Sequence, residues 1–152
     1  MRKKVENIIV HISDSTWGSA REIDSWHKQK GWKMIGYHFV IDNSFILPDF
    51  ELYPMNGSIE LGRPLDGDLF IEENEIGAHA LGYNDKSIGV CGIGKEGWTK
   101  SQECSLIMLL RALCSKFNIP KENVLGHYET ESGKAQGKTC PNLDMDMIRA
   151  EL

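Results

Sequence analysis

The stretch Asn7-Ile-Ile-Val-His-Ile12 decides the fold. It is a short run of β-branched apolar residues bounded by polar positions, a pattern typical of a buried strand. His11 lies at or near the end of this run, where a strand can present a polar side chain. The segment therefore predicts a buried strand that carries a candidate functional residue.

Along the sequence, predicted helices alternate with further predicted strands. Two of them begin with a capping box, a Ser or Thr three residues ahead of a Glu or Gln. These helices are expected over about residues 20–30 and from Thr99 to a point before Pro120, and a terminal helix is expected over 143–152. The additional strands are expected at 37–41, 58–61, 87–92 and 124–127, with an irregular excursion at 42–55.

Strands joined by a hairpin and strands separated by helices cannot all be parallel. The order therefore predicts an α/β fold with a mixed central β-sheet flanked by helices. The length of 152 residues suits one core, so a single domain is expected over 1–152.

Composition and charge exclude several classes of protein. Apolar residues make up 41% and charged residues 26% of the chain, ordinary values for a globular domain. The net charge of -5 and the lack of a long Lys/Arg run argue against nucleic acid as a partner. Met1–Lys4 resembles the start of a signal peptide, but only Ile8–Val10 is apolar after it. We expect synthesis in the cytoplasm without a signal peptide, no membrane contact, a monomer and no disulfide framework among the four cysteines.

Three residues have the character of a zinc-binding set, namely His11, His127 and Cys140. Two imidazoles and a thiolate leave the fourth tetrahedral position open for water, as in catalytic zinc sites. Residue types alone also allow core histidines and an inert small cysteine.

The chain resembles the type 2 N-acetylmuramoyl-L-alanine amidases, a group that includes the amidase-type phage lysozymes and the peptidoglycan recognition proteins. Nine segments carry the resemblance, in order, across about residues 8–144. They are Ile9-Val-His-Ile-Ser13, Arg21-Glu-Ile-Asp-Ser-Trp-His27, Gly36-Tyr-His-Phe39, Gly62-Arg63, Gly77-Ala-His-Ala80, Gly82-Tyr-Asn84, Ser87-Ile-Gly-Val90, Gly126-His-Tyr-Glu129 and Lys138-Thr-Cys-Pro141.

The resemblance implies a zinc-dependent amidase that cuts the amide bond between N-acetylmuramic acid and L-alanine in peptidoglycan. His11, His127 and Cys140 would be the zinc ligands, with Tyr37 and Lys138 as catalytic residues. Related proteins that bind the cell wall without cutting it typically replace the cysteine, so Cys140 favours an enzyme. The stretch between His127 and Cys140 and the excursion at 42–55 depart from the phage lysozymes.

Four other residues are assigned lesser roles. His79 is interpreted as a cleft residue that contacts the peptidoglycan or muropeptide substrate, with a surface histidine as the alternative. Glu129 is a candidate base or a partner of a ligand imidazole, and equally a plain surface carboxylate. His38 and His27 are interpreted as structural residues.

Three rival functions stay open at this point. One is a peptidoglycan-binding module without activity, and another is a cysteine hydrolase that uses Cys140 and His127. The third is a cytoplasmic amidase that recycles muropeptides. A phage endolysin, released to the periplasm or cell wall during lysis, is the favoured role because the Tyr-His-Phe and Gly-Tyr-Asn segments resemble that branch most.

Overall fold

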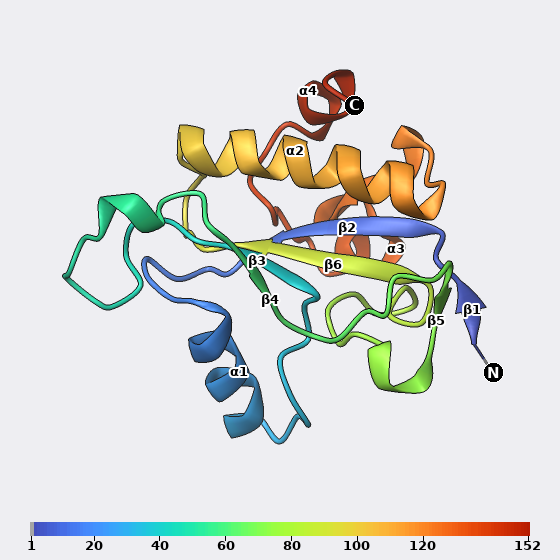
Figure 1. Cartoon of the computed structure of the whole chain (residues 1–152), viewed down its shortest axis with the longest axis horizontal. Coiled ribbons are helices and arrows are strands. Elements are labelled where there is room, and N and C mark those ends of the chain that lie inside the picture. Colours follow the sequence, from blue (N-terminus) through green and yellow to red (C-terminus); the bar gives the residue numbers. More distant parts are fainter. Residues whose placement is uncertain (1) are drawn as a thin grey trace.

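A computed structural model describes residues 2–152 and has a mixed five-stranded sheet at its centre (Figure 1). The strand order is β4-β3-β6-β2-β7. Three pairings, β3 with β6, β6 with β2 and β2 with β7, are parallel, and β4 pairs with β3 antiparallel. These strands span Ile59–Leu61 (β4), Phe39–Ile41 (β3), Ser87–Gly92 (β6), Asn7–Ile12 (β2) and Val124–Gly126 (β7). The predicted fold class is confirmed.

The strand β2 has a parallel neighbour on each side and is covered on both faces. Its apolar residues Ile8, Ile9 and Val10 are fully buried. The sequence of a parallel strand that is buried on both faces is a continuous run of apolar residues. This explains why apolar and polar residues do not alternate in this segment. Successive side chains still point to opposite faces, so His11 projects on the other face from Val10.

The helix α2 (Lys100–Phe117) lies along one face of the sheet, and α4 (Met145–Ala150) lies beyond it (Figure 1). The buried residues Leu106, Leu110, Leu113 and Phe117 of α2 belong to the main core cluster, with Ile8 and Val10 of β2 and other buried residues. The predicted capping box is present, since the Thr99 and Gln102 side chains each accept a backbone N–H at this end. Asn118, with φ of 53°, ends the helix in the left-handed conformation.

The helix α1 (Ala20–Gln29) covers part of the opposite face (Figure 1). Ser19 caps its first turn by accepting a hydrogen bond from the Glu22 backbone N–H. A second, smaller core cluster forms beneath it and includes Ile23, Val40 and Cys91. This is the face on which His11 lies, because His11 and Cys91 are register partners on adjacent strands.

Several short elements were not predicted. β1 (Lys3–Lys4) pairs with β5 (Phe70–Ile71) in a separate two-stranded sheet, and each strand is too short to leave a periodic pattern in the sequence. The stretch between His127 and Cys140 contains α3 (Glu131–Ala135). Short 3-10 helices occupy Tyr53–Met55, Glu73–Glu75, Lys121–Asn123 and His127–Glu129.

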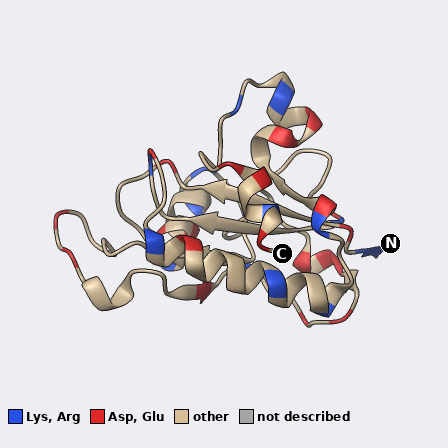
Figure 2. Cartoon of the chain, turned by 90° about the horizontal axis from the view of Figure 1, so that it is seen from above, with Lys and Arg blue, Asp and Glu red and all other residues tan. Residues whose placement is uncertain are grey.

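The excursion at 42–55 extends away from the sheet, at the left of Figure 1, and ends in the first of these 3-10 helices. Lys and Arg are interspersed with Asp and Glu along the ribbon (Figure 2). Among the helices of residues 2–152, none is long and apolar enough to cross a membrane.

Candidate active site

Two neighbouring parallel strands bring the two candidate histidine ligands together. His11 is the fifth residue of β2, and His127 follows directly after the last residue of β7. Because β2 and β7 run in parallel, their carboxyl ends lie at the same edge of the sheet, where α/β proteins commonly bind ligands. The imidazole centroids of His11 and His127 are 4.7 Å apart.

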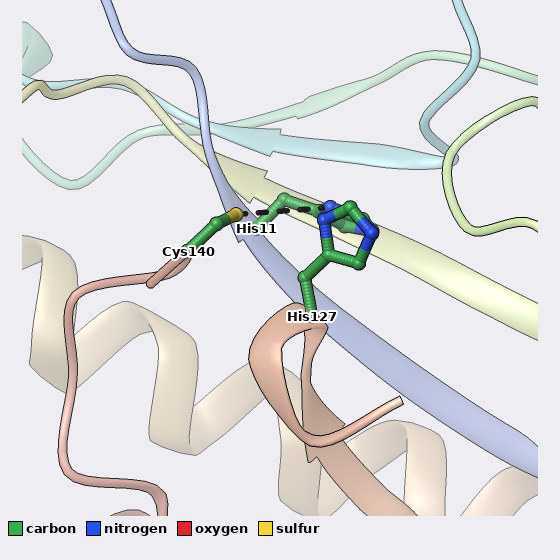
Figure 3. Close-up of side chains that lie close together, drawn as sticks. All are labelled: His11, His127 and Cys140. Atoms are coloured by element: carbon green, nitrogen blue, oxygen red, sulfur yellow. Dashed lines mark hydrogen bonds between the residues drawn. The ribbon is translucent and has the colours of Figure 1, made fainter. Parts of the chain in front are cut away.

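Cys140 completes the group from the segment after α3. Its Sγ lies 3.9 Å from Nδ1 of His11 (Figure 3). The same Sγ accepts a hydrogen bond from the backbone N–H of Ile12 at 3.2 Å. One ligand atom from each of His11, His127 and Cys140 lies within 4.8 Å of the others. Two ligands of one tetrahedral zinc ion lie roughly 3.4 to 3.7 Å apart, so a small side-chain adjustment would bring this set to zinc distances.

The protonation of the two imidazoles suits metal binding. Burial lowers the pKa of His11 well below its ordinary value, and the nearby His79 and His127 lower it further. Burial, followed by the charge of Lys138, also lowers the pKa of His127. Both rings are therefore neutral at pH 7, the form in which imidazole binds a metal.

Burial has the opposite effect on the thiol. It raises the pKa of Cys140 to about 11, although the Ile12 N–H and the charge of Lys138 partly oppose this shift. A buried neutral thiol is a weak nucleophile but becomes a thiolate when a cation binds it. The His, His, Cys set therefore fits a zinc ion better than it fits a free catalytic cysteine.

A cavity of about 320 Å³ opens over this group, and all six predicted site residues line it. Tyr37, just before β3, places its ring centroid 5.0 Å from that of His11. Burial raises the pKa of Tyr37 well above its ordinary value, so its phenol stays protonated and can donate a hydrogen bond. Lys138 lies two residues before Cys140 and presents a cation at the cavity.

His79 reaches the same cavity from the segment between β5 and β6, but its ring also packs inward. Its Nδ1 lies 2.9 Å from Nε2 of His11, and its Nε2 lies 3.3 Å from the Ser87 hydroxyl. Both ring nitrogens thus have partners within the protein. A second hollow, lined in part by Trp32, Leu81 and Gln136, shares His79, His127 and Lys138 with the first.

Three other residues considered from the sequence have partners away from the cavity. Glu129 accepts two hydrogen bonds from the Arg149 guanidinium at 2.8 and 2.9 Å and one from the Gly126 N–H. His38 is buried and bonds to backbone groups through both ring nitrogens, and Nδ1 of His27 accepts a hydrogen bond from the Gly36 N–H. These contacts support the structural interpretation of His38 and His27 and give Glu129 a structural partner.

Two residues on the cavity wall were not singled out from the sequence. Asp14 and Asn142 both line it and both have left-handed backbones, with φ of 58° and 59°. Aspartate and asparagine tolerate this conformation better than other residues with a Cβ. Their positions, three residues after His11 and two after Cys140, are the only signal in the sequence that could have pointed to them.

Comparisons with known proteins agree with this geometry. A family model described as N-acetylmuramoyl-L-alanine amidase matches residues 1–143. The endolysin of Escherichia phage T7 is 34% identical over 95% of this chain and 85% of its own length. A solved structure of the N-acetylmuramoyl-L-alanine amidase LysC from Clostridium intestinale URNW aligns with a TM-score of 0.74 and 31% identity, over 97% of this chain and 85% of that one.

A solved structure of a mutant of the Drosophila protein PGRP-LB, in complex with tracheal cytotoxin, aligns with a TM-score of 0.62 and 25% identity. The alignment covers 93% of this chain and 79% of that one. The family model covers nearly the whole chain, and the phage relative extends over almost all of it. The chain therefore belongs to the N-acetylmuramoyl-L-alanine amidase family.

Proposed function

We propose that this protein is a zinc-dependent endolysin that hydrolyses the amide bond between N-acetylmuramic acid and L-alanine in peptidoglycan. The observation that carries the proposal is the convergence of His11, His127 and Cys140 beneath a cavity that Tyr37 and Lys138 also line. Membership of the amidase family and the likeness to the phage T7 endolysin support the reaction and the biological role.

His11, His127 and Cys140 would hold the metal. Bound zinc supplies Lewis-acid chemistry, which activates water and polarises an amide carbonyl. The neutral imidazoles need not lose a proton to bind it, whereas the Cys140 thiol does.

Tyr37 and Lys138 would act on the charge that develops during amide cleavage. An amide carbonyl gains negative charge on its oxygen as water adds, and the departing amine needs a proton. The protonated Tyr37 phenol is a hydrogen-bond donor, and the Lys138 ammonium is the stronger electrostatic partner for an oxyanion. We assign oxyanion stabilisation to Lys138 and a supporting donor role to Tyr37.

A cysteine hydrolase is the weaker alternative. Nucleophilic cysteines have a lowered pKa, whereas burial raises the pKa of Cys140 to about 11. That alternative also leaves His11 without a role, although its Nδ1 faces the sulfur at 3.9 Å.

The first test is metal content and its link to activity. Protein purified without chelator should contain about one zinc per chain, and a chelator should abolish the digestion of purified cell wall until zinc is restored. A thiol hydrolase would instead survive chelation and be inactivated by alkylation. Less than a tenth of an equivalent of zinc in active protein would refute the metal site.

The second test identifies the bond and the natural substrate. Digestion of intact sacculi should release new amino termini on L-alanine without new reducing sugar ends, which a glycosidase would produce. A peptidoglycan-binding module would bind sacculi without releasing either product. Activity on small anhydro-muropeptides but none on intact sacculi would replace the endolysin role with muropeptide recycling and keep the amidase reaction.

A further inference from the structure

The ring of His79 lies in a space that the sequence keeps open for it. Gly77 and Gly89 face the imidazole so closely that a Cβ on either would come within 2.6 and 2.7 Å of its ring atoms. The Asn84 side chain accepts hydrogen bonds from the backbone N–H groups of His79 and Ala80, at 2.8 and 2.9 Å, which holds this segment in place.

One end of the hydrogen-bond chain through His79 is fixed by a backbone carbonyl. The Ser87 hydroxyl oxygen lies 2.7 Å from the carbonyl oxygen of Tyr83, which can only accept. Two oxygens at that distance need a hydrogen between them, so Ser87 donates to Tyr83. Its single proton is then used, and Ser87 can only accept from Nε2 of His79.

The remaining proton positions follow from this one. A neutral imidazole carries one N–H and one lone pair, and the geometry places the N–H of His79 on the nitrogen that faces Ser87. With the proton on Nε2, Nδ1 of His79 is an acceptor and takes a hydrogen bond from Nε2–H of His11 at 2.9 Å. The lone pair of His11 therefore lies on Nδ1, the nitrogen that faces Cys140.

We propose that His79, together with Ser87, is a positioning residue that fixes the tautomer and ring orientation of His11, so that Nδ1 of His11 is ready to bind the metal. This inference rests on the proposed metal site. It also gives His79 a role other than the substrate contact expected from the sequence. A ligand imidazole commonly donates its second N–H to an acceptor that orients it, and here the acceptor is another imidazole.

Nitrogen NMR of the metal-free protein tests the proton positions directly. Long-range correlations to the ring nitrogens should show both His11 and His79 protonated on Nε2 and unprotonated on Nδ1. A proton on Nδ1 of either ring would overturn the proposal. Because this measurement needs no zinc, it separates failure of the hydrogen-bond chain from failure of the proposed function.

Zinc affinity, measured by competition with a chromogenic chelator, tests the consequence. His79→Ala should weaken zinc binding by about 10- to 100-fold, the usual effect of removing such a partner. Ser87→Ala should weaken it in the same direction and by less, because the His79 ring loses only one partner. Ser87 is fully buried at the start of β6, so an effect there cannot come from a lost substrate contact.

The matched control is Ser105→Ala. Ser105 also donates its hydroxyl proton to a backbone carbonyl, that of Gly57 at 2.6 Å, but from α2 and away from the cavity. The zinc affinity of Ser105→Ala should stay within about twofold of that of the unmodified protein, because Ser105 contacts neither the proposed ligands nor their partners. If His79→Ala and Ser87→Ala both bind zinc like the control, and His79→Ala only raises KM for muropeptide, His79 is a substrate contact and the proposal fails.

Discussion

Replacing Asp42 with asparagine should stabilise the protein, and the gain should grow as the pH rises. Asp42 follows β3 and is fully buried, and neither of its carboxyl oxygens has an N–H or O–H donor among residues 2–152. Its partner is the carboxyl group of Glu60 on β4, which also accepts a hydrogen bond from the Ala20 N–H. Two carboxyl groups can share a hydrogen bond only when one of them is protonated.

The magnitude follows from the pKa of Asp42. Burial, then the hydrogen bond and charge of Glu60, raise this pKa from 3.8 to about 9. The folded state thus holds a proton that the unfolded state releases above pH 3.8, so the contribution of Asp42 to stability is greatest below pH 3.8 and falls until about pH 9. One proton changes the free energy of unfolding by about 1.4 kcal/mol per pH unit, which gives a loss of about 3 kcal/mol between pH 5 and pH 7.

Asp42→Asn removes this titration and keeps the size of the side chain, and its amide can donate to the Glu60 carboxylate. Urea unfolding of the metal-free proteins at pH 5, 6 and 7, followed by circular dichroism, gives the free energy of each. The advantage of the variant should increase by about 3 kcal/mol across this range. Asp49→Asn is the control, since Asp49 is exposed with φ of 57°, a conformation that asparagine also tolerates. An advantage of Asp42→Asn that stays constant or shrinks with pH would refute the reasoning.

Two further predictions concern residues around the site. Tyr37→Phe and Lys138→Ala should each lower turnover on cell wall by about 10²-fold or more while zinc content and folding stay unchanged. Near-normal turnover of Lys138→Ala would show that this lysine has no catalytic role. Glu129→Gln should lower the free energy of unfolding by roughly 1 to 3 kcal/mol, because it weakens the paired hydrogen bonds to Arg149. The zinc affinity of Glu129→Gln should match that of the unmodified protein. A tenfold loss of zinc affinity would show that Glu129 supports the metal site.

Local signals in the sequence were sufficient for most of the fold. The β-branched run of β2 and the capping box of α2 depend on neighbouring residues only, so their positions could be predicted closely. The pairing of β1 with β5 could not, because two residues per strand carry no period and the partners lie 66 or more positions apart. α3 was missed for a similar reason, since five residues are too few for a helical pattern.

The candidate site shows the same division. His11 and His127 could be chosen from the sequence because each follows or ends an apolar run, and Cys140 because of the resemblance that its segment carries. The contact of His79 with His11 could not be predicted, because it depends on how the segment before β6 folds back over the sheet. Asp42 is a further feature that the sequence does not predict. An aspartate beside an irregular excursion is expected to be exposed to water, whereas Asp42 is fully buried.

The hydrogen-bond chain behind His11 has a consequence for the charge of the site. Among the described residues, no carboxylate hydrogen-bonds to His11 or His79, so every group in the hydrogen-bond chain from His11 to the Tyr83 carbonyl is uncharged. A divalent zinc ion with one thiolate would then carry a net charge of +1, and Lys138 adds a second positive charge at the cavity. An aspartate in place of His79 could also accept the N–H of His11 but would cancel one of those positive charges. Because amide cleavage builds negative charge on the carbonyl oxygen, we expect a neutral outer partner to favour the reaction more than a carboxylate would.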